Sequence, residues 1–241
     1  MKGVLLCGGE GTRLRPFTEV VNKHLIRVHT LPMSEYPLLK MIEAGIEDIL
    51  IVSGGENFAA VVKYFGSGKK WNVTITHAIQ DSAGGIAQAL GLAKHFVGRD
   101  KVLVILGDNL FNMSLRNEVK SFNEAVIYKA LLFSITSETP ERFGVLKFDK
   151  QGNVVDVIEK PTTYVSDCIL SGIYMYTSHV FDVISQITPS HRNELEITDV
   201  NSYYIRDGSA KVVKMSGWWT DCGKIETLLK AEELIKHDKS F

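Results

Sequence analysis

Short apolar runs alternate with segments of helical spacing through the first half of the chain, and this rhythm constrains the fold more than any other feature. The predicted strands span residues 3–7, 48–54, 72–79 and 101–109. The predicted helices between them span residues 32–44, 56–68 and 84–96. A strand–helix–strand repeat places parallel strands in one sheet and covers both faces of that sheet with crossover helices. We therefore predict an α/β fold with a mainly parallel sheet.

The second half of the chain is more mixed and predicts an antiparallel portion beside this sheet. Its predicted strands lie in residues 125–136, 144–161, 168–177 and 210–217, and its predicted helices in residues 178–187, 195–208 and 223–238. The segment 144–161 reads as two strands joined by a hairpin turn around Gly152. No linker, repeat or low-complexity tract interrupts the chain, so the two halves are predicted to form one continuous unit.

Composition and charge exclude several classes of protein. The chain has 241 residues, 45% of them hydrophobic, which is enough to bury a substantial core. Its 27 basic and 28 acidic side chains argue against a nucleic-acid binder with a broad basic face. No apolar run reaches the roughly 18 residues that span a bilayer, and the N-terminal run is too short for a signal peptide. We expect a cytoplasmic protein that binds neither membrane nor nucleic acid, with Cys7, Cys168 and Cys222 as inert thiols.

A glycine-rich turn follows the first predicted strand and has the chemistry of an anion site. Gly8, Gly9 and Gly11 allow positive φ and expose bare backbone N–H groups, and Arg13 follows directly. The turn is not a Walker A loop, because no Gly-Lys-Ser/Thr ends it. It is not a dinucleotide fingerprint either, because Leu14 stands where the third glycine would be. Two interpretations stay open, an anion cradle of another type or a tight turn with solvated arginines.

Two aspartates have the right chemistry for a divalent cation. Asp108 ends the apolar run 101–109, and Asp221 follows two tryptophans in "GWWTDCGK". Each could instead cap the segment that follows it. Together they suit Mg²⁺, which binds one or two carboxylates and fills its other positions with phosphate oxygens and water. Because ligands of open α/β sheets bind at the carboxyl ends of strands, Asp108 and the glycine turn are predicted to share a site.

Four further residues could contact a nucleotide or a sugar phosphate. Lys23 and Lys160 could bind phosphate, although an ordinary solvated cation is the commoner role for such a residue. Gln80 and Gly85 frame the turn "QDSAGGIAQA" and could read the edge of a base through hydrogen bonds. The alternative is that this turn is only a loop and a helix start.

Ten sequence blocks occur in an order and spacing that identify a resemblance. The blocks are "GVLLCGGEGTRLRPFT", "NKHL", "PM", "QDSAGGIAQAL", "VILGDNLF", "ERFGV", "IEKP", "SGIYMY", "NELEITDVN" and "WWTDCG". Over essentially its whole length the chain resembles the sugar-phosphate nucleotidyltransferases, in particular the short bacterial form of glucose-1-phosphate thymidylyltransferase. The resemblance implies one domain over residues 1–241 with a Rossmann-like mixed sheet flanked by helices. It also implies a nucleotide-binding portion at about 1–115 and an added antiparallel, sugar-binding and C-terminal portion at about 116–241.

The resemblance also implies a role for each matching residue. The implied catalytic residues are Arg13, Lys23 and Lys160. The implied nucleotide-binding residues are Gly8, Gly9, Gly11, Thr12, His24, Gln80 and Gly85. The implied sugar-binding residues are Asn109, Gly144, Glu159 and Gly172. Asp108 and Asp221 are implied to bind Mg²⁺.

The implied reaction joins dTTP and glucose 1-phosphate into dTDP-glucose and pyrophosphate, by in-line attack of the sugar phosphate on the α-phosphorus. Family habit also implies a homo-oligomer. The chain departs from the family pattern at three positions, where His24, Arg27 and Leu31 replace the usual Gln, Pro and Lys. These departures leave open an enzyme that uses UTP or CTP, and a non-catalytic homologue that only binds a sugar nucleotide. A dinucleotide-dependent oxidoreductase is disfavoured by Leu14.

Overall fold

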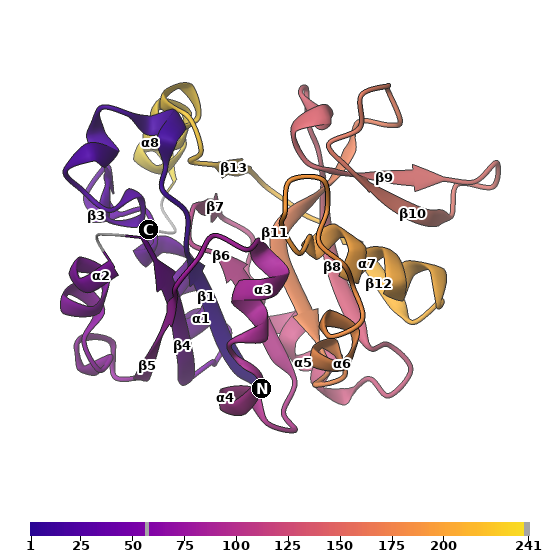
Figure 1. The fold of residues 1–241 in the computed structure, drawn as a ribbon, viewed down its shortest axis with the longest axis horizontal. Coiled ribbons are helices and arrows are strands. Elements are labelled where there is room, and N and C mark those ends of the chain that lie inside the picture. The colour runs from indigo at the N-terminus through magenta and orange to yellow at the C-terminus, as the bar shows by residue number, and fades with distance from the viewer. Residues whose placement is uncertain (56–57, 239–241) are drawn as a thin grey trace.

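The computed structural model describes residues 1–55 and 58–238, and it is built on a nine-stranded mixed sheet flanked by helices (Figure 1). Along the main path of the sheet the strands follow the order β10 (Val154–Glu159), β9 (Gly144–Phe148), β11 (Cys168–Tyr176), β6 (Val102–Leu106), β1 (Lys2–Cys7), β4 (Asp48–Gly54) and β5 (Thr74–Gln80). Off this path, β8 (Ala130–Thr136) pairs with β11, and β12 (Ala210–Lys214) pairs with β8.

The pairing directions confirm the predicted fold class. Strand β1 is parallel to β4 and β6, and β4 is parallel to β5. Strand β11 is antiparallel to β6, β8 and β9, and β9 and β10 form the predicted hairpin. A parallel N-terminal region is therefore continuous with a mainly antiparallel region, and Figure 1 shows them on opposite sides of the view.

Eight α-helices and two small two-stranded sheets complete the described part of the chain. The helices are α1 (Glu35–Glu43), α2 (Phe58–Phe65), α3 (Ile86–Gly91), α4 (Lys94–Val97), α5 (Arg116–Glu124), α6 (Val180–Ile184), α7 (Ile197–Arg206) and α8 (Ile225–His237). The small sheets pair β2 (Arg27–Val28) with β3 (Leu31–Pro32), and β7 (Asn109–Phe111) with β13 (Trp219–Asp221). Short 3-10 helices include η1 (Thr12–Leu14), η3 (Lys23–Leu25) and η5 (Pro140–Arg142).

Strand β1 lies between two apolar cores, which explains why its sequence is apolar at every position. Val4 and Leu6 belong to the core formed with residues of α3, α6 and α7. Leu5 and Cys7 belong to the core formed with residues of α1, α2 and α5. Because successive side chains of a strand point to opposite faces, only a continuous apolar run can serve two cores. Helix α8 packs on the N-terminal half, where Ala231 joins a third, smaller core.

Several predicted elements differ in extent from the observed ones. The predicted helix 84–96 is two helices, α3 and α4, and the predicted strand 101–109 ends at Leu106 because Gly107 and Asp108 turn the chain into β7. The predicted strand 125–136 begins only at Ala130. Residues 56 and 57 of the predicted helix 56–68 lie outside the described residues. The division of the chain near residue 115 stays a prediction.

Within residues 1–55 and 58–238, the structure has no helix that is both long enough and apolar enough to cross a membrane.

Candidate active site

The carboxyl ends of β1 and β6 bring the glycine turn and Asp108 together. The two strands are adjacent and parallel, and the N–H of Gly107 donates to the carbonyl of Leu6 over 2.8 Å. A cavity of about 220 Å³ opens at this edge. Six of the predicted site residues line it: Gly8, Gly9, His24, Gln80, Gly85 and Asp108. The glycine turn and Asp108 therefore line one cavity.

Strand pairing places Asp221 next to Asp108. In the small sheet, Asp221 of β13 lies opposite Asn109 of β7. The N–H of Cys222 donates to the backbone carbonyl of Asp108 over 2.8 Å. The alternative capping roles of the two aspartates are wrong, because Lys224 is the N-cap of α8 and Asp108 leads into a strand.

The two carboxylates have different electrostatic surroundings. Burial alone would raise the pKa of Asp108, but the Lys23 ammonium, which forms a close ion pair with it, holds that pKa well below its usual range. Burial and the neighbouring charge of Asp108 raise the pKa of Asp221, against the opposing effect of Arg142. Lys23 is therefore not a solvated cation, since its side chain is only 10% exposed.

The two aspartates suit Mg²⁺, which needs few protein ligands, better than a metal ion whose ligands all come from the protein. Among the described residues no group of three or more His, Cys, Asp or Glu side chains could hold a metal ion. Two carboxylates suffice for Mg²⁺ when phosphate oxygens and water complete its coordination. The repulsion that raises the pKa of Asp221 is the kind of strain that a divalent cation between the two carboxylates would relieve.

The cavity wall is tightly packed at two glycines, and at Gly85 the backbone requires glycine. A Cβ atom at Gly8 would lie 2.5 Å from Oε1 of Gln80. Gly85 has a φ of 96°, and a Cβ there would lie 2.4 Å from the carbonyl oxygen of Leu195. Gln80 itself is held in place, because its Nε2 donates to Oε1 of Gln88 over 2.6 Å. The turn after β5 is thus packed tightly between the glycine turn and the segment around Leu195.

In the rest of the glycine turn, Gly9 is exposed at the cavity and Gly11 is half-buried. Gly9 and Gly11 have φ values of 102° and 65°, in the region that glycine favours. Thr12 and Arg13 are exposed in η1. A Cβ built on Gly223 would lie 3.4 Å from Nη2 of Arg13 and 2.6 Å from Oδ2 of Asp221, so Arg13 and Asp221 reach the same place.

His24 is a buried, neutral side chain in the cavity wall. Burial, assisted by the charge of Lys23, lowers the pKa of His24 to about 3. Its Nδ1 atom is buried and has no hydrogen-bond partner among the described residues. An imidazole in this state can give or accept one hydrogen bond to a ligand.

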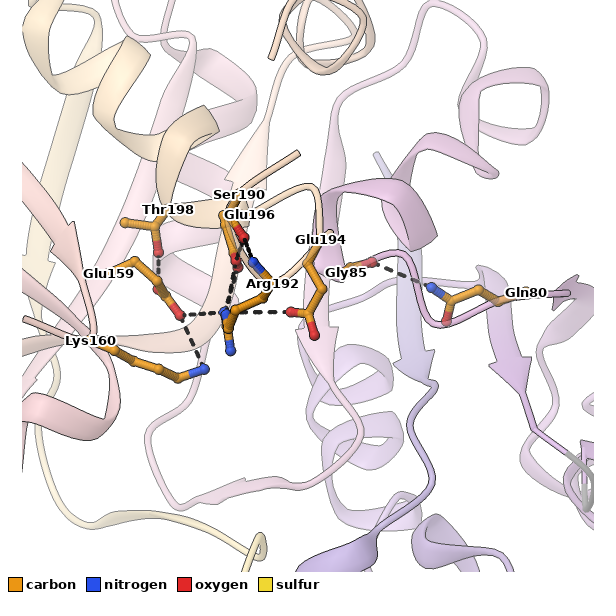
Figure 2. A network of polar contacts seen from close by, with 9 residues as sticks. All are labelled: Gln80, Gly85, Glu159, Lys160, Ser190, Arg192, Glu194, Glu196 and Thr198. Atoms are coloured by element: carbon orange, nitrogen blue, oxygen red, sulfur yellow. Dashed lines mark hydrogen bonds and ion pairs between the residues drawn. The ribbon is translucent and has the colours of Figure 1, made fainter. Parts of the chain in front are cut away.

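A second group of predicted residues gathers around Glu159 (Figure 2). The hydroxyl of Thr198 donates to Glu159, and Nζ of Lys160 lies 3.4 Å from the same carboxylate. Lys160 has a φ of 40°, a strained conformation for a residue with a side chain. Gly144 is adjacent, since a Cβ there would lie 3.1 Å from Oγ1 of Thr198.

Asn109 connects Gly172 to the aspartate site through its buried amide. Its Oδ1 accepts from the N–H of Gly172 over 2.9 Å and from Nε1 of Trp219 over 2.8 Å. Its Nδ2 donates to Asp108 over 2.9 Å. The amide oxygen of Asn109 therefore joins β7, β11 and β13, while its amide nitrogen contacts Asp108.

Two arginines that the sequence did not single out contact predicted site residues. Arg192 lies between Glu159 and Glu194, at 3.1 and 3.4 Å, and also pairs with Glu196 at 2.8 Å (Figure 2). Arg142 pairs with Asp221 at 3.2 Å. Both arginines stand in or directly before blocks that carry the resemblance, "ERFGV" and "NELEITDVN", which was the available signal.

Comparisons with known proteins give the family of the chain. The family model described as Nucleotidyl transferase matches residues 2–238. The low-salt glycan biosynthesis nucleotidyltransferase Agl11 of Haloferax volcanii is 41% identical over 100% of this chain and 68% of its own length. The glucose-1-phosphate thymidylyltransferase of Neisseria meningitidis is 37% identical over 98% of this chain and 83% of its own length.

Solved structures show the same fold. A candidate glucose-1-phosphate thymidylyltransferase from Bacillus anthracis, in complex with sucrose, superposes with a TM-score of 0.93 at 42% identity, covering 99% of this chain and 96% of that one. A UDP-glucose pyrophosphorylase complexed with UDP-glucose shares the fold, with a TM-score of 0.86 at 22% identity over 98% of both chains. The match over residues 2–238, together with these relatives, makes this chain a member of the nucleotidyl transferase family, an enzyme that transfers nucleotidyl groups.

Proposed function

We propose that this enzyme is a glucose-1-phosphate thymidylyltransferase, which makes dTDP-glucose and pyrophosphate from dTTP and glucose 1-phosphate. The observation that carries the proposal is the convergence of two aspartates: Asp108 lines the cavity together with Gly8, Gln80 and Gly85, and strand pairing brings Asp221 beside Asp108. The relatives named as glucose-1-phosphate thymidylyltransferases, at 33–37% identity, support the choice of substrates.

In the proposed reaction a phosphate oxygen of the sugar phosphate attacks the α-phosphorus of the nucleotide. A new phosphorus–oxygen bond forms as the bond to pyrophosphate breaks on the opposite side, and no protein nucleophile is needed. The main obstacle is repulsion between two polyanions, so catalysis depends on positioning and on positive charge. We assign Arg13 to the leaving phosphates and Lys160 to the attacking phosphate.

Other residues of the chain bind and orient the substrates. Gln80 and Gly85 would read the base, His24 would face the nucleotide, and the glycine turn would offer N–H groups to its phosphates. Glu159 with the adjacent Gly144, and Asn109 with the adjacent Gly172, would bind the sugar. Mg²⁺ held by Asp108 and Asp221 would supply positive charge for the phosphate oxygens. Lys23 would neutralise Asp108 and fix its orientation.

Release of pyrophosphate tests this function directly. The purified enzyme is mixed with glucose 1-phosphate, Mg²⁺ and either dTTP, UTP or CTP, and pyrophosphate and sugar nucleotide are measured. We expect kcat/KM to be highest with dTTP, by about 10-fold or more over UTP, because the two bases differ by one methyl group. If kcat/KM is highest with UTP or CTP, that nucleotide is the substrate and dTTP is not. Binding of nucleotide without pyrophosphate release would identify a non-catalytic homologue.

The UTP alternative has a specific basis. The name of the Haloferax relative specifies no nucleotide, and the fold is shared with a UDP-glucose pyrophosphorylase. A homo-oligomer in the cytoplasm is part of the same proposal, and the mass of the protein in solution tests its oligomeric state.

A further inference from the structure

Arg142 faces one of the two aspartates from a separate part of the fold. It ends η5, just before β9, whereas Asp221 ends β13. Nη2 of Arg142 lies 3.2 Å from Oδ2 of Asp221, and the two side chains are 20% and 15% exposed. The guanidinium lies over the ring of Phe143 at 5.2 Å, and that ring packs edge-on against Trp219 at 5.6 Å. Arg142 is therefore held against β13 by aromatic packing as well as by charge.

The ion pair between Arg142 and Asp221 is incomplete. It uses a single N–H···O contact, whereas a stable arginine–carboxylate pair commonly makes two parallel ones. Nε of Arg142 is buried and has no hydrogen-bond partner within residues 1–55 and 58–238. Asp108, by contrast, has both the close ion pair with Lys23 and a hydrogen bond from Asn109. The pair on Asp221 is thus the weaker of the two and the easier to break.

We propose that Arg142 is the resident counter-ion of Asp221 and competes with the divalent cation for that carboxylate. The inference rests on the proposed function, in which Asp221 is a metal ligand. The guanidinium occupies one lone pair of Oδ2 and places a positive charge beside the carboxylate, so a cation that binds Asp221 is repelled by Arg142 and has to displace it to use that lone pair. Without Arg142 the Asp221 carboxylate, only 15% exposed and close to Asp108, would lose its ion-pair partner, which would destabilise the fold. Arg142 thereby keeps the aspartate pair balanced at the expense of metal affinity.

A purely structural ion pair makes a different prediction from competition. Loss of Arg142 lowers stability in both cases, but only competition makes the metal bind more tightly when the arginine is removed. The sign of the change in metal affinity therefore separates the two roles.

The test measures binding of Mn²⁺, as a spectroscopic substitute for Mg²⁺, to the enzyme without nucleotide, through the electron paramagnetic resonance signal of the free ion. We expect Arg142→Gln to lower the dissociation constant of Mn²⁺ by about 5-fold, the factor that loss of a weak ion pair gives. Arg142→Lys keeps the charge, so its dissociation constant for Mn²⁺ should stay close to that of the unmodified enzyme. Arg206→Gln removes an arginine that pairs with Asp156, away from the site. Its dissociation constant for Mn²⁺ should equal that of the unmodified enzyme.

A double variant checks that the effect passes through Asp221. In the Asp221→Asn background, Arg142→Gln should no longer tighten Mn²⁺ binding. Three results would each overturn the proposal. Arg142→Gln could bind Mn²⁺ no more tightly than the unmodified enzyme, the gain could persist in the Asp221→Asn background, or none of the proteins could bind Mn²⁺. Circular dichroism checks that each variant folds, and Arg142→Met serves as a second neutral variant if Arg142→Gln does not. Pyrophosphate release by the unmodified enzyme decides the proposed function separately.

Discussion

At the scale of single residues, the site depends on charges that are placed close together inside the protein. Lys23 balances Asp108, and Arg142 balances Asp221. Asp108 lines a cavity whose walls include bare glycine backbone, and Asp221 lies beside Asp108. Replacing one of these residues should therefore affect the chemistry far more than the fold, provided that the replacement has the same shape.

Asp108→Asn should lower kcat by about 10²- to 10³-fold, judging by the loss of single electrostatic groups in other enzymes. The amide keeps the shape of the side chain but loses the charge that faces Lys23 and binds the proposed cation. Steady-state pyrophosphate release measures the change, and a thermal melt shows whether the variant is folded. A variant that keeps near-normal turnover would remove Asp108 from the mechanism.

Gly85→Ala should weaken both the fold and nucleotide binding. The residue has a φ of 96°, and the new Cβ would lie 2.4 Å from the carbonyl oxygen of Leu195. We expect a loss of about 1–3 kcal/mol in the free energy of unfolding and a higher KM for the nucleotide. Urea unfolding and steady-state kinetics measure the two effects.

Gly91→Ala is the matched control for that substitution. Gly91 ends helix α3, and the nearest side-chain atom to its new Cβ is Cγ2 of Ile184, at an ordinary contact distance of 3.6 Å. We expect it to leave stability unchanged or raise it by up to about 1 kcal/mol. Equal losses from Gly85→Ala and Gly91→Ala would contradict the requirement for glycine at position 85.

At the scale of elements, polar contacts fasten helix α7 to strand β10. Asp156 accepts from Nη2 of Arg206 over 2.6 Å and from Oγ of Ser202 over 2.5 Å. Burial would raise the pKa of Asp156, but these hydrogen bonds outweigh it and lower the pKa below its usual value. Stabilisation from this carboxylate is therefore present above the pKa of the unfolded state, about 3.9, and is lost as the pH falls through the lower folded pKa.

Asp156→Asn should destabilise the enzyme by about 1 kcal/mol at pH 7 and by less at low pH. The estimate is modest because Arg206 is 67% exposed, so solvent screens the charge. Urea unfolding of the variant and the unmodified enzyme, at pH 7 and near pH 3.5, gives the difference at each pH. A difference that does not shrink on acidification would mean that the ionised carboxylate is not the source of the stabilisation.

At the scale of the whole molecule, stability depends on the strand that two cores share. Leu5 of β1 is 0% exposed and lies in the core with α1, α2 and α5. Leu5→Ala should cost about 2–5 kcal/mol in the free energy of unfolding. Leu229→Ala on α8, where the side chain is 61% exposed, should change it by less than about 0.5 kcal/mol. Thermal and urea unfolding measure both, and similar costs for the two variants would contradict the central role of β1.

Local patterns along the chain correctly predicted the fold class and most elements, because apolar periodicity reflects burial over neighbouring residues. The run at 3–7 is apolar throughout because β1 faces two cores, and the glycine turn follows it as predicted. The same patterns predicted that strand β8 begins at residue 125, although it begins at Ala130 and Val126 and Ile127 are exposed. The sequence does not show whether another part of the fold buries a given apolar side chain.

The sequence by itself determined the order of the elements, the glycine turn at the end of β1 and the identity of the acidic and basic candidates. Only the tertiary structure decided which candidates meet. Pairing of β7 with β13 places Asp221 beside Asp108, and the position of η5 places Arg142 on Asp221. The physical reason is that helix and strand signals arise from nearby residues, whereas this electrostatic site arises from contacts between distant segments, such as Arg142 and Asp221, which are 79 residues apart.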